Sequence, residues 1–291
     1  MADLWPLLVE PFIEFGFMRR ALAGCLALSL GAAPVGVFLM LRRMSLTGDA
    51  MAHAILPGAA IAYLIAGLSL PAMTLGGIVS GLLVAVASTL VARSGRQSED
   101  SSLAAFYLMS LSLGVVIVST YGSQVDLLHV LFGSVLALDD DTLLLIGLIA
   151  SISLVGLAVL YRPLVFECVD PNLLPRRAGW GSVAHFGFMG LLVINLVAGF
   201  HALGTLMSIG LLVLPATSAR FWARTVNGLM LLAVLIAFGG GVIGLLLSYH
   251  FEWPTGPTIV LTLGVVYGVS LVFSPSGPLL KRYRARRHYE S

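Results

Sequence analysis

Residues 42–58 read RRMSLTGDAMAHAILPG, and after the two arginines the segment is apolar except for two ionisable side chains, Asp49 and His53. If this segment is helical, residues four apart share one face and lie about 6 Å apart along the axis. An ionisable group at membrane depth is energetically costly and usually marks a pathway or a binding site. Because a carboxylate and an imidazole are ligands for first-row transition metals, the pair predicts a metal pathway.

Two structural interpretations compete with a metal pathway. Thr47 is a plausible N-cap, which would put Asp49 in the first helical turn, where a carboxylate complements the helix dipole. His53 could be an ordinary packing residue near a membrane surface. Each alternative explains one side chain, whereas a metal pathway explains both. Pro57 favours the pathway, because it has no N–H to donate to the His53 carbonyl and leaves that oxygen for water, a side chain or a cation.

The composition is that of a membrane protein with many spans. Of the 291 residues, 58% are hydrophobic and 10% are charged, against about 25% charged residues in soluble domains. The mean hydropathy is +1.00. The two cysteines, Cys25 and Cys168, form neither a disulfide framework nor a metal motif. We expect one membrane-embedded domain over residues 1–291.

The hydropathy predicts an all-α polytopic fold with about eight or nine transmembrane helices. The apolar runs are each near the ~20 residues that a bilayer requires. They cover residues 17–41, 50–67, 71–92, 103–120, 142–161, 182–200, 202–219, 226–249 and 257–274. Residues 125–138 are apolar but short, which fits a surface helix, a re-entrant helix or part of a broken span.

The basic residues predict the orientation of the chain. With nine spans, most arginines between spans lie on the same side as the basic tail at residues 278–291. The positive-inside rule makes that side cytoplasmic, with the N-terminus outside and the C-terminus inside. Acidic residues collect on the outer side. They either raise the local cation concentration there or simply remain where basic residues are excluded.

Two further pairs combine an acid with a histidine. Asp126 and His129 lie near the outer end of the fourth predicted span, and His250 and Glu252 precede the helix-breaking sequence PTGP at residues 254–257. Each pair could form a gate or help cations reach the pathway. The alternatives are a helix cap with an interfacial histidine for the first pair and an ordinary outer turn for the second.

The longest polar interruption on the inner side is residues 162–182. It could dock on a partner protein as a short amphipathic helix, or it could be a solvated loop, which the residues alone favour. The chain contains neither a GxxxxGK[ST] phosphate loop nor an HExxH motif, which disfavours ATP binding of that kind and zinc protease activity. We expect a transport subunit and not an enzyme.

Four segments, in order along nearly the whole chain, resemble the ABC-3 family, the membrane permeases of zinc and manganese ABC transporters. They are residues 42–58, 125–133, 212–220 and 254–258. The resemblance implies a homodimeric permease of the bacterial cytoplasmic (inner) membrane. Its partners would be a cytoplasmic ABC ATPase and an external metal-binding protein. It also implies that Asp49 and His53 belong to the metal pathway.

The same resemblance assigns residues 166–178 to docking on the ATPase. The coupling residues that it implies are Glu167, Asp170, Pro171 and Asn172. Residues 172–177 read NLLPRR, which is more basic and more interrupted by proline than the family's usual form. This segment is therefore the point at which the chain departs from the family pattern.

The expected cargo is a divalent transition metal, with no permanently bound cofactor. In a dimer, two Asp49–His53 pairs would hold Zn²⁺ tetrahedrally, or Mn²⁺ with added oxygen ligands. The outward-facing histidines favour zinc, whereas Asp126 and Glu252 keep manganese or iron open. The alternatives are a permease for a metal chelate such as a siderophore and a cation transporter driven by an ion gradient.

Overall fold

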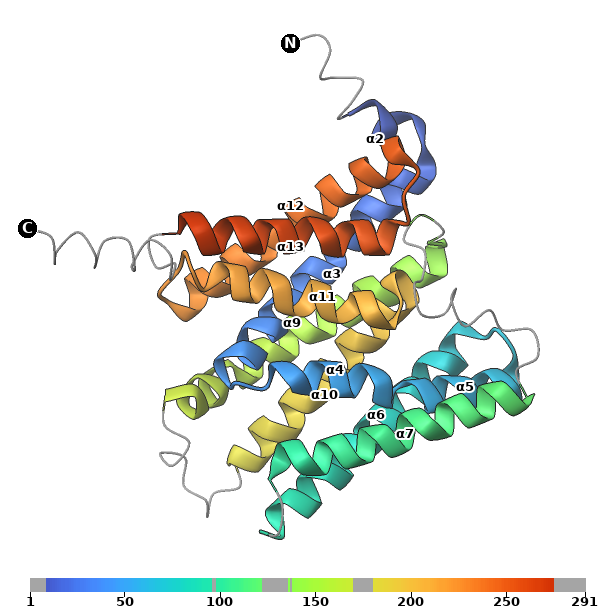
Figure 1. Ribbon diagram of the computed structural model, residues 1–291, viewed down its shortest axis with the longest axis vertical. Helices are drawn as coiled ribbons and strands as arrows, with labels where there is room; N and C mark the ends of the chain where they lie inside the picture. The colour runs from blue at the N-terminus through green and yellow to red at the C-terminus, as the bar shows by residue number, and fades with distance from the viewer. Residues whose placement is uncertain (1–8, 96–97, 122–135, 137, 170–179, 275–291) are drawn as a thin grey trace, which may run out of the picture.

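The structure is a computed structural model that describes residues 9–95, 98–121, 136, 138–169 and 180–274. Most of these residues are helical, and none of those described forms a β-strand. Figure 1 shows the helices packed as a bundle. In chain order they are α2 Glu10–Glu14, α3 Gly16–Leu41, α4 Ser45–Ala54, α5 Leu56–Ala66, α6 Leu70–Arg93, α7 Glu99–Tyr121, α9 Asp140–Val169, α10 Trp180–Leu203, α11 Thr205–Ala219, α12 Val226–Phe251 and α13 Thr255–Phe273.

The prediction of an all-helical protein with eight or nine membrane spans is confirmed. Within the described ranges, 8 helical stretches are long and apolar enough to cross a membrane, and one of them is α4 together with α5. The predicted span at residues 202–219 is α11, which has 15 residues and is shorter than the ~20 residues of a full crossing. The predicted short segment at residues 125–138 lies almost wholly outside the described residues.

Contacts at the helix ends show which ends share a side of the bundle. At the start of α3 and α9, Arg20 lies 3.6 Å from Asp140. At the opposite ends of these two helices, Arg42 lies 3.1 Å from Glu167. The side chain of Arg93 at the end of α6 donates to Ser182 near the start of α10. The ends of α3, α6 and α9 and the start of α10 therefore lie on one side of the bundle, toward the lower left in Figure 1.

The break between α4 and α5 lies at Ile55. The carbonyl oxygen of Ala54 accepts the hydroxyl of Ser80 from α6 at 2.6 Å and the hydroxyl of Ser110 from α7 at 3.2 Å. The His53 carbonyl, which the sequence predicts to be available, accepts the Ile55 N–H instead. That part of the prediction is wrong. Neighbouring helices, rather than a cation, satisfy the backbone at the break, as they do at other breaks at membrane depth.

The start of α4 also differs from the prediction. The helix begins at Ser45 with Met44 as its N-cap, and no side chain caps it. Thr47 lies inside the first turn and is buried. Asp49 therefore lies in the second turn, beyond the first turn where the helix dipole stabilises a carboxylate most. The alternative that Asp49 is present to complement the helix dipole requires a first-turn position, which Asp49 does not have.

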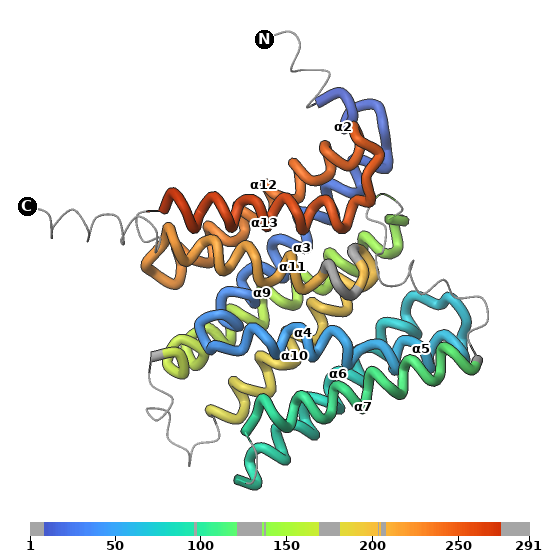
Figure 2. Tube along the Cα trace, in the orientation of Figure 1, coloured from blue at the N-terminus to red at the C-terminus, as the bar shows by residue number. Residues whose placement is uncertain are grey.

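Two glycines bring α5 and α6 into close contact directly after the break. A Cβ added to Gly58 would lie 2.0 Å from the carbonyl oxygen of Gly76, and a Cβ added to Gly76 would lie 2.3 Å from the carbonyl oxygen of Gly58. Small residues of this kind let membrane helices approach each other closely. The Cα trace in Figure 2 shows α4 and α5 following each other along α7, which contacts both.

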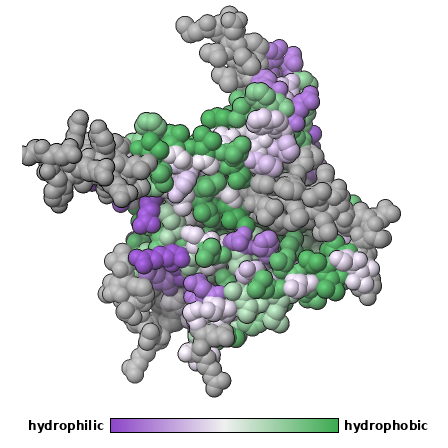
Figure 3. Space-filling model, in the orientation of Figure 1, coloured by the Kyte–Doolittle hydropathy of each residue, from purple (hydrophilic) through white to green (hydrophobic). Residues whose placement is uncertain are grey.

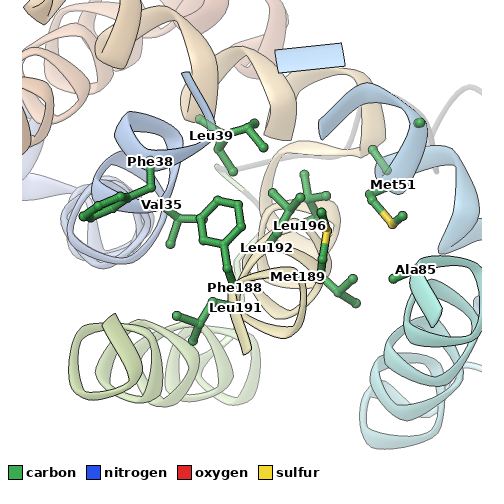
Figure 4. Packing of buried hydrophobic residues seen from close by; sticks show 14 of the residues in the cluster. Val35, Phe38, Leu39, Met51, Ala85, Phe188, Met189, Leu191, Leu192 and Leu196 are labelled. Carbon is green, nitrogen blue, oxygen red and sulfur yellow. The ribbon is translucent and has the colours of Figure 1, made fainter. Parts of the chain in front are cut away.

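The buried centre of the bundle is formed by α3 and α10. Phe38 and Phe188 are fully buried, and Figure 4 shows Phe188 of α10 beside Val35 of α3. Met51 of α4 belongs to the same cluster of buried side chains. The helix that contains Asp49 and His53 is therefore packed on one face against the most buried helices of the protein.

The outer helices expose apolar side chains. Large exposed hydrophobic residues include Leu83, Leu108, Leu144, Val159 and Leu261. Figure 3 shows broad apolar areas on this face of the molecule, with smaller groups of hydrophilic residues between them. A soluble monomer rarely exposes apolar patches of this extent, whereas a membrane protein presents them to lipid.

Candidate functional site

Asp49 and His53 lie on the same face of α4, as predicted. His53 Nε2 is 3.8 Å from Asp49 Oδ1, which is too long for a hydrogen bond. The side chain of Asp49 is 55% exposed and that of His53 is 21% exposed. His53 Nδ1 is buried and has no hydrogen-bond partner among the described residues. The imidazole is therefore not held by hydrogen bonds as a buried packing histidine usually is.

An aromatic side chain of α7 orients the imidazole instead. The rings of His53 and Tyr107 are stacked, with centroids 6.4 Å apart and an interplanar angle of 27°. Stacking restricts the orientation of the imidazole ring without using a ring nitrogen in a hydrogen bond. This arrangement suits a ligand that has to bind and release an ion.

A pocket of about 360 Å³ reaches Asp49 between α4 and α7. Its lining includes Thr47 and Asp49 from α4 and Asp100, Ser101 and Tyr107 from α7. Carboxylate and hydroxyl oxygens from two helices therefore border one space, which is open to the surface through the exposed Asp49 side chain.

The sequence analysis did not identify Asp100 or Tyr107. An acid in the first turn of a span and an aromatic residue two turns later are common at membrane interfaces, so neither differs from an ordinary boundary. Only the packing of α7 along α4 brings them to the pocket.

The donor set of one chain is incomplete for a metal ion. In the described ranges, no group of three or more His, Cys, Asp or Glu side chains is arranged to hold a metal. Asp49 and His53 supply two ligands, and transition metals in proteins usually have four to six. The remaining ligands would come from water, backbone or a second copy. Such a partial set suits a cargo that must leave again.

The second predicted pair does not join this site. His250 is in the last turn of α12, and Glu252 is its C-cap in the left-handed conformation, with φ 55°. Both are exposed. In Figure 1 the turn between α12 and α13 lies at the upper right, away from α4. Asp126 and His129 lie outside the described residues.

One predicted coupling residue is in a partly buried polar cluster. Glu167 Oε2 lies 3.1 Å from Arg42 Nη2, the same Arg42 atom is 3.1 Å from His185 Nδ1, and His185 Nε2 is 3.3 Å from Glu99 Oε1. We call Arg42, Glu99, Glu167 and His185 the Arg42 cluster. The sequence analysis assigned no site role to Arg42, Glu99 or His185. The other predicted coupling residues, Asp170, Pro171 and Asn172, lie outside the described residues.

The chain is similar to known transport proteins over nearly its whole length. Residues 14–274 match the model of the ABC 3 transport family. The manganese import system permease protein ScaB of Streptococcus gordonii is 31% identical over 280 residues, which is 94% of this chain and 99% of that protein. The chelated iron transport system membrane protein YfeD of Yersinia pestis is 29% identical over 285 residues, 98% of this chain and 94% of that protein.

A solved structure has the same fold. PsaBC from Streptococcus pneumoniae, in complex with Fab, superposes with a TM-score of 0.83 and 28% sequence identity, covering 97% of this chain and 100% of the matched chain. The likeness of the fold and the family match agree. The chain belongs to the ABC 3 transport family and is an integral membrane transport subunit, not an enzyme.

Proposed function

We propose that this chain is the permease of an ABC importer that moves a divalent transition metal, with Mn²⁺ as its main cargo, through the Asp49–His53 site. The observation that carries the proposal is the carboxylate of Asp49 and the imidazole of His53 on one face of α4, 3.8 Å apart, with the carboxylate bordering a pocket. ATP hydrolysis takes place in a separate partner chain, so no ion gradient is required. Relatives of this chain named as metal permeases support the class of cargo.

Manganese is favoured over zinc, which the sequence analysis preferred. That preference depended on counting histidines, and His250 is away from α4 while His129 lies outside the described residues. Asp100, Thr47 and Ser101 add oxygen atoms to the pocket wall, and oxygen ligands suit Mn²⁺ better than Zn²⁺. ScaB is named for manganese, and YfeD, named for chelated iron, makes iron the nearest competitor.

We further propose that the permease works as a homodimer with one permease domain per chain. Two copies related by a two-fold axis would combine two carboxylates and two imidazoles, which completes the coordination that one chain lacks. Movement of the two copies apart would divide this ligand set and release the ion. In this arrangement the N-terminus is outside the cell, the C-terminus is cytoplasmic, and an external metal-binding protein delivers the ion.

The test is metal uptake by the complete importer in proteoliposomes, with Mn²⁺, Fe²⁺ and Zn²⁺ supplied singly. Asp49→Ala and His53→Ala should each abolish Mn²⁺ uptake while the assembled complex stays intact in size-exclusion chromatography. Asp141→Ala, which removes an exposed acid at the start of α9, is the matched control and should transport normally. Normal Mn²⁺ uptake by both site variants would refute the site, and uptake of zinc alone by the wild type would refute the cargo.

A further inference from the structure

The Arg42 cluster joins four helices at one side of the bundle. Arg42 is the C-cap of α3, Glu99 is the first residue of α7, Glu167 is near the end of α9, and His185 is in the second turn of α10. One guanidinium nitrogen, Nη2, lies 3.1 Å from Glu167 Oε2 and 3.1 Å from His185 Nδ1. Arg42 thus bridges the last turn of α9 and the beginning of α10.

The hydrogen bonds determine the state of the histidine. A guanidinium can only donate, so His185 Nδ1 must accept from Arg42 and the ring proton must be on Nε2. Thr89 Oγ1 donates its own proton to the Ala85 carbonyl. It therefore accepts from His185 Nε2, 3.2 Å away, as does the Glu99 carboxylate at 3.3 Å. Arg42 is in this way connected through a neutral imidazole to the start of α7.

The Arg42–Glu167 pair of the cluster is largely buried, whereas Glu99 is 44% exposed. The side chains of Arg42 and Glu167 are 12% and 14% exposed, and the guanidinium lies over the ring of Phe188, 5.0 Å from its centroid. Desolvating a buried ion pair often costs as much as its attraction returns. Moreover, Arg42 Nη1 has no hydrogen-bond partner among the described residues, and the 3.1 Å contact of Glu167 Oε2 with Arg42 Nη2 is an ion pair without hydrogen-bond geometry. The two side chains are close, but some of their hydrogen-bonding atoms are unused. A group that exchanges partners between two states is expected to have such unused atoms.

The cluster has two direct connections to the Asp49–His53 pair. Arg42 is followed by a tight turn in which Arg43 has φ 59° and the Met44 N–H donates to the Leu39 carbonyl at 2.9 Å. α4 then starts at Ser45, so a displacement of Arg42 moves the helix that contains Asp49. The second connection is α7, which begins at Glu99 and contains Tyr107, the residue stacked on His53.

The other side of the cluster leads to the segment that the family resemblance assigns to the ATPase. α9 ends at Val169 and α10 begins at Trp180, so Glu167 and His185 are on the two helices that flank residues 170–179. Short, packed connections between two sites transmit a conformational change only if both sites bias the same element. Here that element is the Arg42 side chain.

We infer that Arg42 is a positioning residue that transmits movement of the facing ends of α9 and α10 to the Asp49–His53 pair, and so couples ATP hydrolysis to metal release. This inference rests on the proposed function. It assigns Arg42 neither metal binding nor ATPase binding, which distinguishes it from a residue of either site. Its loss should therefore leave both sites occupied and remove the connection between them.

The experiment measures Mn²⁺ transported per ATP hydrolysed by the complete importer in proteoliposomes. The variants are Arg42→Gln, Glu167→Gln and Arg42→Lys, with Arg43→Gln as the matched control, because Arg43 is the adjacent arginine and is exposed. Retention of the ATPase in size-exclusion chromatography and binding of radioactive Mn²⁺ are measured on the same preparations. We expect Arg42→Gln to lower the transport ratio about tenfold, with assembly, hydrolysis and Mn²⁺ binding close to wild type. Glu167→Gln should also lower the transport ratio. Arg42→Lys should be intermediate, because a single ammonium group does not reproduce the planar fork of donors.

Several results would overturn the inference. A wild-type transport ratio in Arg42→Gln and Glu167→Gln would show that the bridge is not used. Parallel loss of transport and hydrolysis in Arg42→Gln, or loss of Mn²⁺ binding, would give Arg42 a role in docking or in the metal site instead. The proposed function fails separately, if the wild-type complex transports no Mn²⁺ at all.

Discussion

His53 differs from the other buried histidines in what its ring nitrogen atoms contact. His185 accepts from Arg42 at Nδ1 and faces Thr89 at Nε2, and His201 Nε2 lies 3.0 Å from Thr74 Oγ1. Buried polar atoms are nearly always paired in this way. His53 Nδ1 is buried and has no partner among the described residues. This contrast within one protein is the argument for a ligand at His53 and for structural roles at the other two.

Asp100 tests whether the pocket is the exit from the Asp49–His53 pair. In the proposed orientation the start of α7 is on the cytoplasmic side, so an imported ion meets Asp100 only after the pair. Asp100→Asn should lower the maximal rate of Mn²⁺ uptake by about two- to tenfold, because a negative charge that attracts the ion from the pair into the pocket is lost. The external Mn²⁺ concentration at half-maximal uptake should stay that of the wild type, and initial uptake rates over a range of concentrations measure both quantities. Asp49→Asn should instead abolish uptake, and equal curves for Asp100→Asn and the wild type would exclude Asp100 from the pathway.

Asp139 shows a second use of an acid, at the start of α9. Its Oδ1 accepts the backbone N–H of Thr142 at 3.0 Å. Hydrogen bonds from the hydroxyl and N–H of Thr142 hold the pKa of the Asp139 carboxyl below its usual value. A lowered folded-state pKa means that the ionised cap stabilises the protein above the unfolded pKa, and that this contribution is lost as the pH falls through the folded pKa. The exposure of Asp139 keeps the charge contribution small.

Asp139→Ala should therefore destabilise the protein by about 1 kcal/mol at neutral pH through loss of the N-cap. The measurement is thermal unfolding in detergent, with Asp141→Ala as the control in the same turn. The difference between wild type and Asp139→Ala should decrease as the pH falls below the usual range of an aspartate. A difference that grows on acidification would contradict the cap.

At the scale of elements, the break between α4 and α5 comes two residues after His53 and so ends the helix that contains the Asp49–His53 pair. The sequence analysis predicts that Pro57 leaves the His53 carbonyl without its helical donor, but it treats residues 50–67 as one span and does not predict the break at Ile55. The carbonyl that neighbouring helices satisfy is that of Ala54. The Ala54 carbonyl takes both hydroxyls, from Ser80 and Ser110, and these come from helices whose position depends on tertiary packing. The end of α4 is therefore joined by hydrogen bonds to α6 and α7. These bonds fix the position of α4 along α7, and so the position of His53 beside Tyr107.

Removing both hydroxyls tests this junction. Ser80→Ala with Ser110→Ala should destabilise the protein by about 1–3 kcal/mol, the cost of leaving a buried carbonyl unsatisfied, while each single variant costs less than the pair. Thermal unfolding in detergent measures it. Ser151→Ala is the control, because that hydroxyl bonds within its own helix to the Gly147 carbonyl and is exposed. If the double variant unfolds like Ser151→Ala, the Ala54 carbonyl does not depend on these serines.

At the scale of the molecule, the sequence predicts features that depend on neighbouring residues, such as helix spans. It does not predict contacts between residues far apart in the chain. The predicted run 17–41 is α3, Gly16–Leu41, and the run 226–249 is α12, Val226–Phe251, because spanning length depends only on consecutive residues. Asp49 and His53 are found because their spacing is helical. Arg42 and His185 are 143 residues apart, and no sequence pattern brings them together. The zinc preference has the same weakness, because a count of histidines does not say which of them meet.

The last prediction concerns two copies of the chain. If both copies supply ligands to one site, a dimer with one His53→Ala copy should retain well below half of the wild-type Mn²⁺ uptake. Two independent sites would add and retain about half. The proposed orientation has the termini on opposite sides of the membrane, so a direct tandem fusion would need an extra span. Co-expression of two differently tagged copies, followed by purification over both tags, gives the mixed dimer instead.

A mixed dimer with one Asp141→Ala copy is the control. Uptake at half of wild type would show that each chain conducts the metal alone, and the incomplete ligand set of one chain would then have to be completed by water or backbone.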